Sequence, residues 1–166
     1  MACLVIVNGS LEFAVRTSVP DIDHYSKRIR SAFALAYEGF NGYIVNAMRT
    51  GQGGVPLSPC LQLTERVFTC KSGPLLSGTD ILDRSSPMMS SWISRIHGPV
   101  YLCGLGLETD IRELGLELVK SKEVILLADA CAPYNKKPDD GTDAVLDLED
   151  AGVCVQTVSE VYAAYL

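Results

Sequence analysis

Positive charge, histidine and paired cysteines are scarce in this sequence of 166 residues. It has 14 lysines and arginines and 20 aspartates and glutamates, so its net charge is −6. The basic residues form no stripe that could neutralise the phosphate backbone of a nucleic acid. With only 2 histidines and no Cys-x-x-Cys spacing, a structural zinc site would have almost no ligands. We therefore expect no nucleic-acid partner, no metal and no cofactor.

Long apolar runs and a basic leader segment are missing too. The first apolar run, residues 4–7, is far too short for a signal peptide or a membrane span. Four of the six cysteines lie within or at the end of similar short runs, where a free thiol behaves as a small buried hydrophobe. These features predict a protein of the reducing cytoplasm that binds no membrane.

Two apolar patterns alternate along the chain. Short continuous runs bounded by turn residues predict buried parallel strands, and they span residues 4–7, 43–47, 67–70, 100–103, 124–128 and 153–156. Apolar residues three and four positions apart predict amphipathic helices between them, over residues 21–39, 86–96, 108–120, 142–151 and 159–166. The exception is residues 50–59, whose glycines and prolines predict a long loop of the kind that often covers a site.

This alternation predicts a single α/β domain over residues 1–166. We expect a three-layer α/β/α, Rossmann-like architecture with a parallel sheet of about six strands and right-handed crossovers. Ligands bind such sheets at the carboxyl ends of the strands, so the residues that directly follow each strand form the candidate site. They are Asn8, residues 48–50, Lys71, residues 104–110 and Asp129.

The turn after the fourth predicted strand allows two further hypotheses. Gly104-Leu-Gly106 precedes a helix and a strand that ends at Asp129, as in a dinucleotide fingerprint, although Thr109 takes the place of its third glycine. Cys103 could act as a nucleophile beside this turn, but its apolar run and the lack of a nearby histidine favour a buried thiol. Nucleotide binding is therefore a third option behind the two functions considered below.

Taken in order, several segments resemble the isochorismatase-like cysteine hydrolase family, which includes nicotinamidases and N-carbamoylsarcosine amidases. Residues 3–13 are similar to the family's first strand and its Asp-x-x-x-x-Phe segment, with Asn8 in place of the catalytic aspartate and Phe13 at the phenylalanine. Residues 67–71 look like the strand that ends on the catalytic lysine, here Lys71. The strongest resemblance, to the nucleophile turn, the Asp-Ala strand and the closing element, lies in residues 100–106, 124–132 and 150–160.

The resemblance implies a nucleophilic cysteine at the start of the helix after the turn, where the helix N-terminus and the lysine lower its pKa. If the turn is aligned with the family from Gly104 without gaps, Asp110 takes the position of the cysteine. If it is aligned on residues 106–110 instead, Arg112 takes that position. Neither register supplies a thiol, and the amide of Asn8 cannot act as a general base. The histidines that bind metal in nicotinamidases are also missing after the second predicted strand.

Two functions from different classes fit these observations. We favour a non-catalytic member of the fold that keeps its pocket or oligomer surface for small-molecule binding or assembly. The alternative is a hydrolase acting on a small amide or enol ether, in which Asp110 activates water or forms an acyl intermediate beside Lys71. Around Asn8, Lys71 and Asp110, the candidate pocket comprises Phe13, Arg49, Gly106, Leu107, Thr109 and Arg112.

The resemblance also suggests a homo-oligomer. The exposed side chains of its interface could come from Met88, Met89, Tyr162 and Tyr165.

Overall fold

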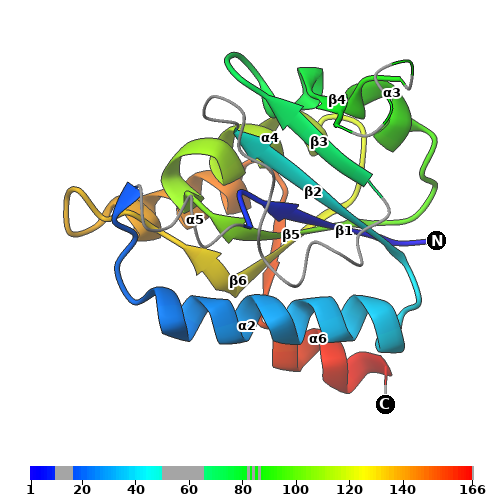
Figure 1. Cartoon of the computed structure of the whole chain (residues 1–166). Coiled ribbons are helices and arrows are strands. Elements are labelled where there is room, and N and C mark those ends of the chain that lie inside the picture. Colours follow the sequence, from blue (N-terminus) through cyan, green and yellow to red (C-terminus); the bar gives the residue numbers. More distant parts are fainter. Residues whose placement is uncertain (10–16, 50–65, 82, 84, 86, 166) are drawn as a thin grey trace.

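The computed structural model describes residues 1–9, 17–49, 66–81, 83, 85 and 87–165, and within them seven strands form one central sheet (Figure 1). The strands lie in the order β4-β3-β2-β1-β5-β6-β7. In chain order they are β1 (Cys3–Val7), β2 (Tyr43–Arg49), β3 (Arg66–Cys70), β4 (Thr79–Asp80), β5 (Val100–Leu105), β6 (Val124–Ala132) and β7 (Cys154–Gln156).

Six of the described strands run parallel to one another, which confirms the prediction from the continuous apolar runs. The seventh, β4, has two residues and runs antiparallel to β3 at the edge of the sheet. Two residues are too few to form an apolar pattern, and the prediction of about six strands missed β4 for this reason. Every residue of β1 and β5 is buried, and these two strands pair at the centre of the sheet.

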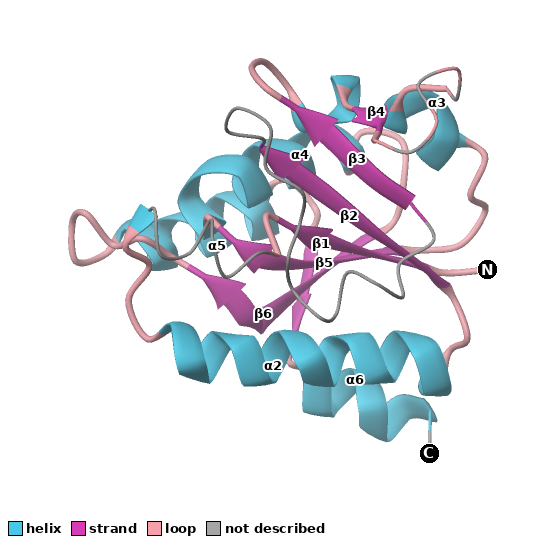
Figure 2. Cartoon of the chain, viewed as in Figure 1, coloured by secondary structure: helices cyan, strands magenta, loops and turns pink. Residues whose placement is uncertain are grey.

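Helices cover both faces of the sheet, so the three-layer α/β/α architecture is confirmed (Figure 2). α2 and α6 lie side by side on one face, while α4 and α5 pack together on the other, with α3 beside β3 and β4. No described helix is long and apolar enough to cross a membrane. The helices are α2 (Ile22–Ala34), α3 (Met89–Ser94), α4 (Arg112–Leu118), α5 (Asp140–Asp150) and α6 (Val158–Tyr165), with the shorter turns η1 (Leu35–Gly39), η3 (Leu75–Ser77) and η4 (Leu107–Ile111).

The structure corrects one expectation at the level of a single residue. Met89 is completely buried, because it lies one helical turn before Ile93 on the inner face of α3, and it therefore supplies no oligomer surface. The helix expected to open with Glu108 and Asp110 begins there, as the π-helical turn η4, which runs directly into α4. The predicted loop at residues 50–59 lies outside the described residues. The exposed members of the expected oligomer surface are Met88, Tyr162 and Tyr165.

β1 and β5 approach each other closely at Gly104, near the end of β5. The φ angle of Gly104 is +128°, and a Cβ at this position would lie 2.1 Å from the carbonyl oxygen of Val7. The pairing of β5 with β6 also shifts register between Leu102 and Gly104. Glycine is required here because any side chain would enter the backbone of β1.

The described cysteines are mostly core residues. Cys3, Cys70, Cys103 and Cys131 are buried, and Cys154 is exposed. Burial, together with Cys103 and Asp129 nearby, raises the pKa of Cys131 well above its ordinary value, which keeps this thiol protonated. Cys103 has no exposed surface, as expected for a buried thiol rather than a nucleophile.

Candidate functional site

Three polar residues meet at the carboxyl edge of the sheet. Asn8 directly follows β1, Arg49 is the last residue of β2, and Asp110 lies in η4 just after β5. Because β2, β1 and β5 are neighbouring parallel strands, their ends bring together side chains that lie far apart in the sequence. We call these three residues the Asn8–Arg49–Asp110 cluster.

Hydrogen bonds occupy both carboxylate oxygens of Asp110. The side-chain amide of Asn8 donates to Oδ2 of Asp110 at 2.8 Å, while Nε and Nη2 of Arg49 both donate to Oδ1 at 3.1 Å. The backbone N–H of Arg49 donates in turn to Oδ1 of Asn8 at 2.7 Å. Asn8 is fully buried, and the side chains of Arg49 and Asp110 are only 21% and 13% exposed. The cluster is thus a closed network around a mostly buried ion pair.

The turn η4 determines that Asp110, and not Arg112, belongs to the cluster. Gly106 opens the turn with a φ of +85°, and the N–H of Ile111 donates to its carbonyl oxygen five residues back. Asp110 therefore lies in the first turn of a helix, where the helix dipole favours a negative charge. Arg112 points outward and pairs with Asp147 at 2.9 Å on the surface.

Lys71 makes no hydrogen bond or ion pair with this network, although it directly follows Cys70, which pairs with Arg49 in the sheet. It is exposed, and none of the described residues forms a hydrogen bond or ion pair with it. The preceding residue, Cys70, is buried instead, and its Sγ lies 3.7 Å from Nη1 of Arg49 and 3.4 Å from the hydroxyl of Ser77. Neighbouring residues of a strand point to opposite faces, so Cys70 and Lys71 diverge at the end of β3. The contact of Cys70 with Arg49 was not predicted, although the position of Cys70 two residues after the buried Phe68 indicates the same face.

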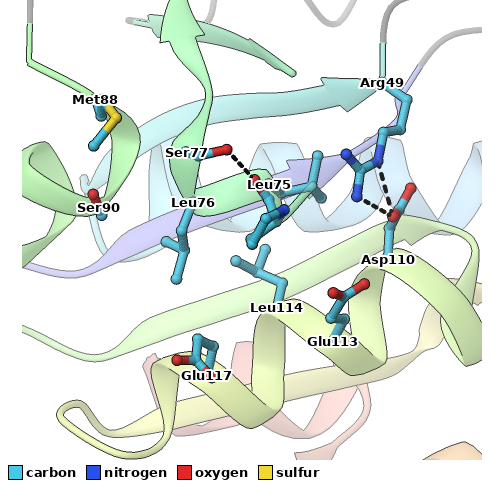
Figure 3. A pocket seen from close by; sticks show the side chains of 11 residues that line it. Arg49, Leu75, Leu76, Ser77, Met88, Ser90, Asp110, Glu113, Leu114 and Glu117 are labelled. Carbon is cyan, nitrogen blue, oxygen red and sulfur yellow. Dashed lines mark hydrogen bonds and ion pairs between the residues drawn. The ribbon is translucent and has the colours of Figure 1, made fainter. Parts of the chain in front are cut away.

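A cavity of about 450 Å³ adjoins the cluster (Figure 3). Arg49 and Asp110 lie at one end of it, leucines form its apolar walls, and Glu113 and Glu117 of α4 lie along one side. Two of the described residues that were expected in the pocket, Arg49 and Asp110, line this cavity. The described lining comprises Arg49, Pro74, Leu75, Leu76, Ser77, Met88, Ser90, Asp110, Glu113, Leu114 and Glu117.

The other expected pocket residues have different positions. Gly106 and Leu107 are buried in the turn, and Thr109 donates from its hydroxyl to the carbonyl oxygen of Gly106 at 3.3 Å. Phe13 lies outside the described residues. Asp129 was the residue that would bind the ribose in the nucleotide-binding hypothesis. In the structure it accepts a hydrogen bond from the N–H of Val158 at 2.9 Å and so caps the start of α6.

Glu108, next to the cluster in sequence, fixes a neighbouring loop. Its two carboxylate oxygens accept hydrogen bonds from the N–H groups of Tyr134 and Asn135, at 2.7 and 3.0 Å. Burial raises the pKa of the Tyr134 phenol, and the charges of Asp110 and Glu108 act in the same direction. In the part of the chain that the structure describes, no three histidine, cysteine, aspartate or glutamate side chains gather in a group that could hold a metal ion.

Solved structures of low sequence identity share this architecture. The MAR1 ribonuclease from Caenorhabditis elegans is 15% identical, with a TM-score of 0.76 over 99% of this chain and 80% of that chain. YcaC from Escherichia coli, an octameric hydrolase of unknown specificity, is 15% identical, with a TM-score of 0.73 over 99% of this chain and 78% of that chain. PnC1 from L. infantum, solved in complex with nicotinate, is 15% identical, with a TM-score of 0.71 over 96% of this chain and 93% of that chain.

The comparison by sequence gives a different result from the comparison by structure. No protein-family model matches the sequence, and no curated protein matches it either. The structural likeness, in contrast, extends over nearly the whole chain. This chain therefore has the fold of the isochorismatase-like hydrolases.

Proposed function

We propose that this chain binds a small molecule at the cavity beside the Asn8–Arg49–Asp110 cluster and lacks cysteine-dependent hydrolysis. The observation that carries the proposal is the hydrogen bonding of Asp110, which one of the two registers of the family resemblance places at the nucleophilic cysteine. Its two oxygens accept three hydrogen bonds from Arg49 and Asn8, which stabilise the carboxylate and oppose its use as a nucleophile or a general base. Asn8, where the resemblance implies an aspartate, carries an amide that cannot act as a base.

The alternative function, hydrolysis of a small amide or enol ether by Asp110 and Lys71, needs these two side chains to face each other. In the structure the cation beside Asp110 is Arg49, whose Nη2 lies 3.1 Å from Oδ1, and Lys71 is exposed to solvent. An arginine does not exchange protons near neutral pH, so it stabilises a carboxylate without supplying an acid or a base. The geometry thus favours binding over catalysis.

We expect the purified protein to hydrolyse a panel of amides, carbamoyl compounds and vinyl ethers no faster than buffer does. Lys71→Ala should leave this background rate unchanged, since Lys71 has no partner among the described residues. A stopped or continuous assay of product formation measures both proteins side by side. Turnover above background that is lost in Lys71→Ala or in Asp110→Asn would favour the hydrolase instead.

We further propose that the chain forms a homo-oligomer in the cytoplasm. The exposed Met88, Tyr162 and Tyr165 leave apolar surface that an interface could cover, and the similar YcaC is octameric. The buried thiols agree with a reducing compartment. Light scattering coupled to size exclusion should give a multiple of the mass of 17.9 kDa, and a monomer mass at micromolar concentration would contradict the proposal.

A further inference from the structure

We propose that the cavity beside the cluster takes an organic cation, namely a protonated amine attached to an apolar body. This inference rests on the proposed binding function and names the chemical class of the ligand. It follows from two properties of the lining, its apolar walls and its excess of negative charge (Figure 3).

The walls of the cavity are suited to an apolar body. Leu75, Leu76 and Leu114 face each other across it, and Pro74 and Met88 extend the same surface. A volume of about 450 Å³ lies within the usual range for pockets that hold small organic ligands. Burying the apolar part of such a ligand supplies most of the binding free energy.

The charges along the cavity select the head group. Among the described lining residues Arg49 alone is cationic, and its guanidinium already pairs with Asp110. Glu113 and Glu117 lie one turn apart on α4, on the face toward the cavity. The described lining therefore carries one positive and three negative side chains, which attracts a cation and repels an anion.

Glu113 is the carboxylate best placed to receive the ammonium group. It lies one turn after the cluster on the same helical segment, and none of the described residues forms a hydrogen bond or ion pair with it. Glu117, in contrast, pairs with Lys120 at 2.9 Å. We therefore expect Glu113 to make the larger contribution to ligand affinity.

Calorimetric titration with probes of similar size tests this assignment. Hexylamine and benzylamine should bind, whereas hexanoate, benzoate and benzyl alcohol should bind at least about tenfold more weakly. Glu113 is exposed, so Glu113→Gln should weaken hexylamine binding only about three- to fivefold, as for an exposed ion pair, and added salt should weaken it as well. Glu149→Gln on the exposed surface of α5, which removes the same charge away from the cavity, is the matched control and should leave the affinity unchanged.

Methyl NMR locates the bound amine. The methyl group of Met88 lines the cavity, whereas Met48 packs with Val67 and Ile81. Hexylamine should shift the Met88 signal and leave the Met48 signal in place. Equal binding of amine, acid and alcohol, or no binding of any probe, would overturn the assigned ligand class. The binding experiments test the ligand class, and the product assay tests the proposed lack of hydrolysis. The two proposals can therefore fail independently of each other.

Discussion

Asp110→Ala should lower the free energy of unfolding by about 2–4 kcal/mol, because it breaks a mostly buried ion pair. The substitution leaves the guanidinium of Arg49, only 21% exposed, without its carboxylate. It also leaves the side-chain amide of Asn8 without its acceptor, and an unsatisfied buried donor adds to the cost. Urea unfolding followed by the fluorescence of Trp92, the only tryptophan, measures the change.

Asp147→Ala is the matched control for this measurement. Asp147 pairs with Arg112 at 2.9 Å, so the two variants remove the same kind of ion pair. The side chains of Arg112 and Asp147 are 40% and 50% exposed, however, and solvent screens their attraction. We expect a loss below about 1 kcal/mol for Asp147→Ala. Equal losses in the two variants would show that the cluster contributes no more than a surface pair.

Gly104→Ala should destabilise the protein by more than about 4 kcal/mol, or prevent folding altogether, because the new Cβ would meet the backbone of β1. This Cβ would lie 2.1 Å from the carbonyl oxygen of Val7, on a central strand that cannot move without disturbing the core. The φ of +128° adds backbone strain for any residue with a side chain. The yield of folded protein and its urea midpoint report the effect.

Gly73→Ala separates the steric contact from the backbone strain. Gly73 also has a positive φ, +84°, but no atom of the described residues lies within 4 Å of its Cβ position. Its replacement should therefore cost only the strain of a left-handed residue, about 1–2 kcal/mol. If Gly104→Ala proved as mild as Gly73→Ala, the close approach of β1 and β5 would be wrong.

The main elements of the fold could be predicted because the strands are buried on both faces. A strand such as β5, buried at every position, produces a continuous apolar run that the chain displays directly. The edge strand β4 has no such signal, since its two residues pair only with β3. A helix opening at Glu108 and Asp110 was predicted, but the π-helical form of η4 was not, because its five-residue hydrogen bond depends on the backbone of Gly106 and not on an apolar pattern.

The candidate site could be predicted only in part. Asn8 and Asp110 both follow central strands, so the topology alone brings them to one edge. The position of Arg49 at the end of β2 was also foreseeable, but its pairing with Asp110 depends on how a long side chain turns after the strand ends. Lys71 shows the same difficulty, because a strand of known position still presents alternate residues to opposite faces.

The closed network of Asn8, Arg49 and Asp110 has a consequence for the ancestry of the chain. Asp110 accepts hydrogen bonds from the side chains of both other residues. The effect of a substitution at one position on stability therefore depends on which residues occupy the other two. A substitution at one position alone should lower the stability of the chain, so we expect the three residues to change together among its relatives. Descendants that keep the role of this chain should be recognisable by asparagine, arginine and aspartate at these three positions, even where overall identity has become low.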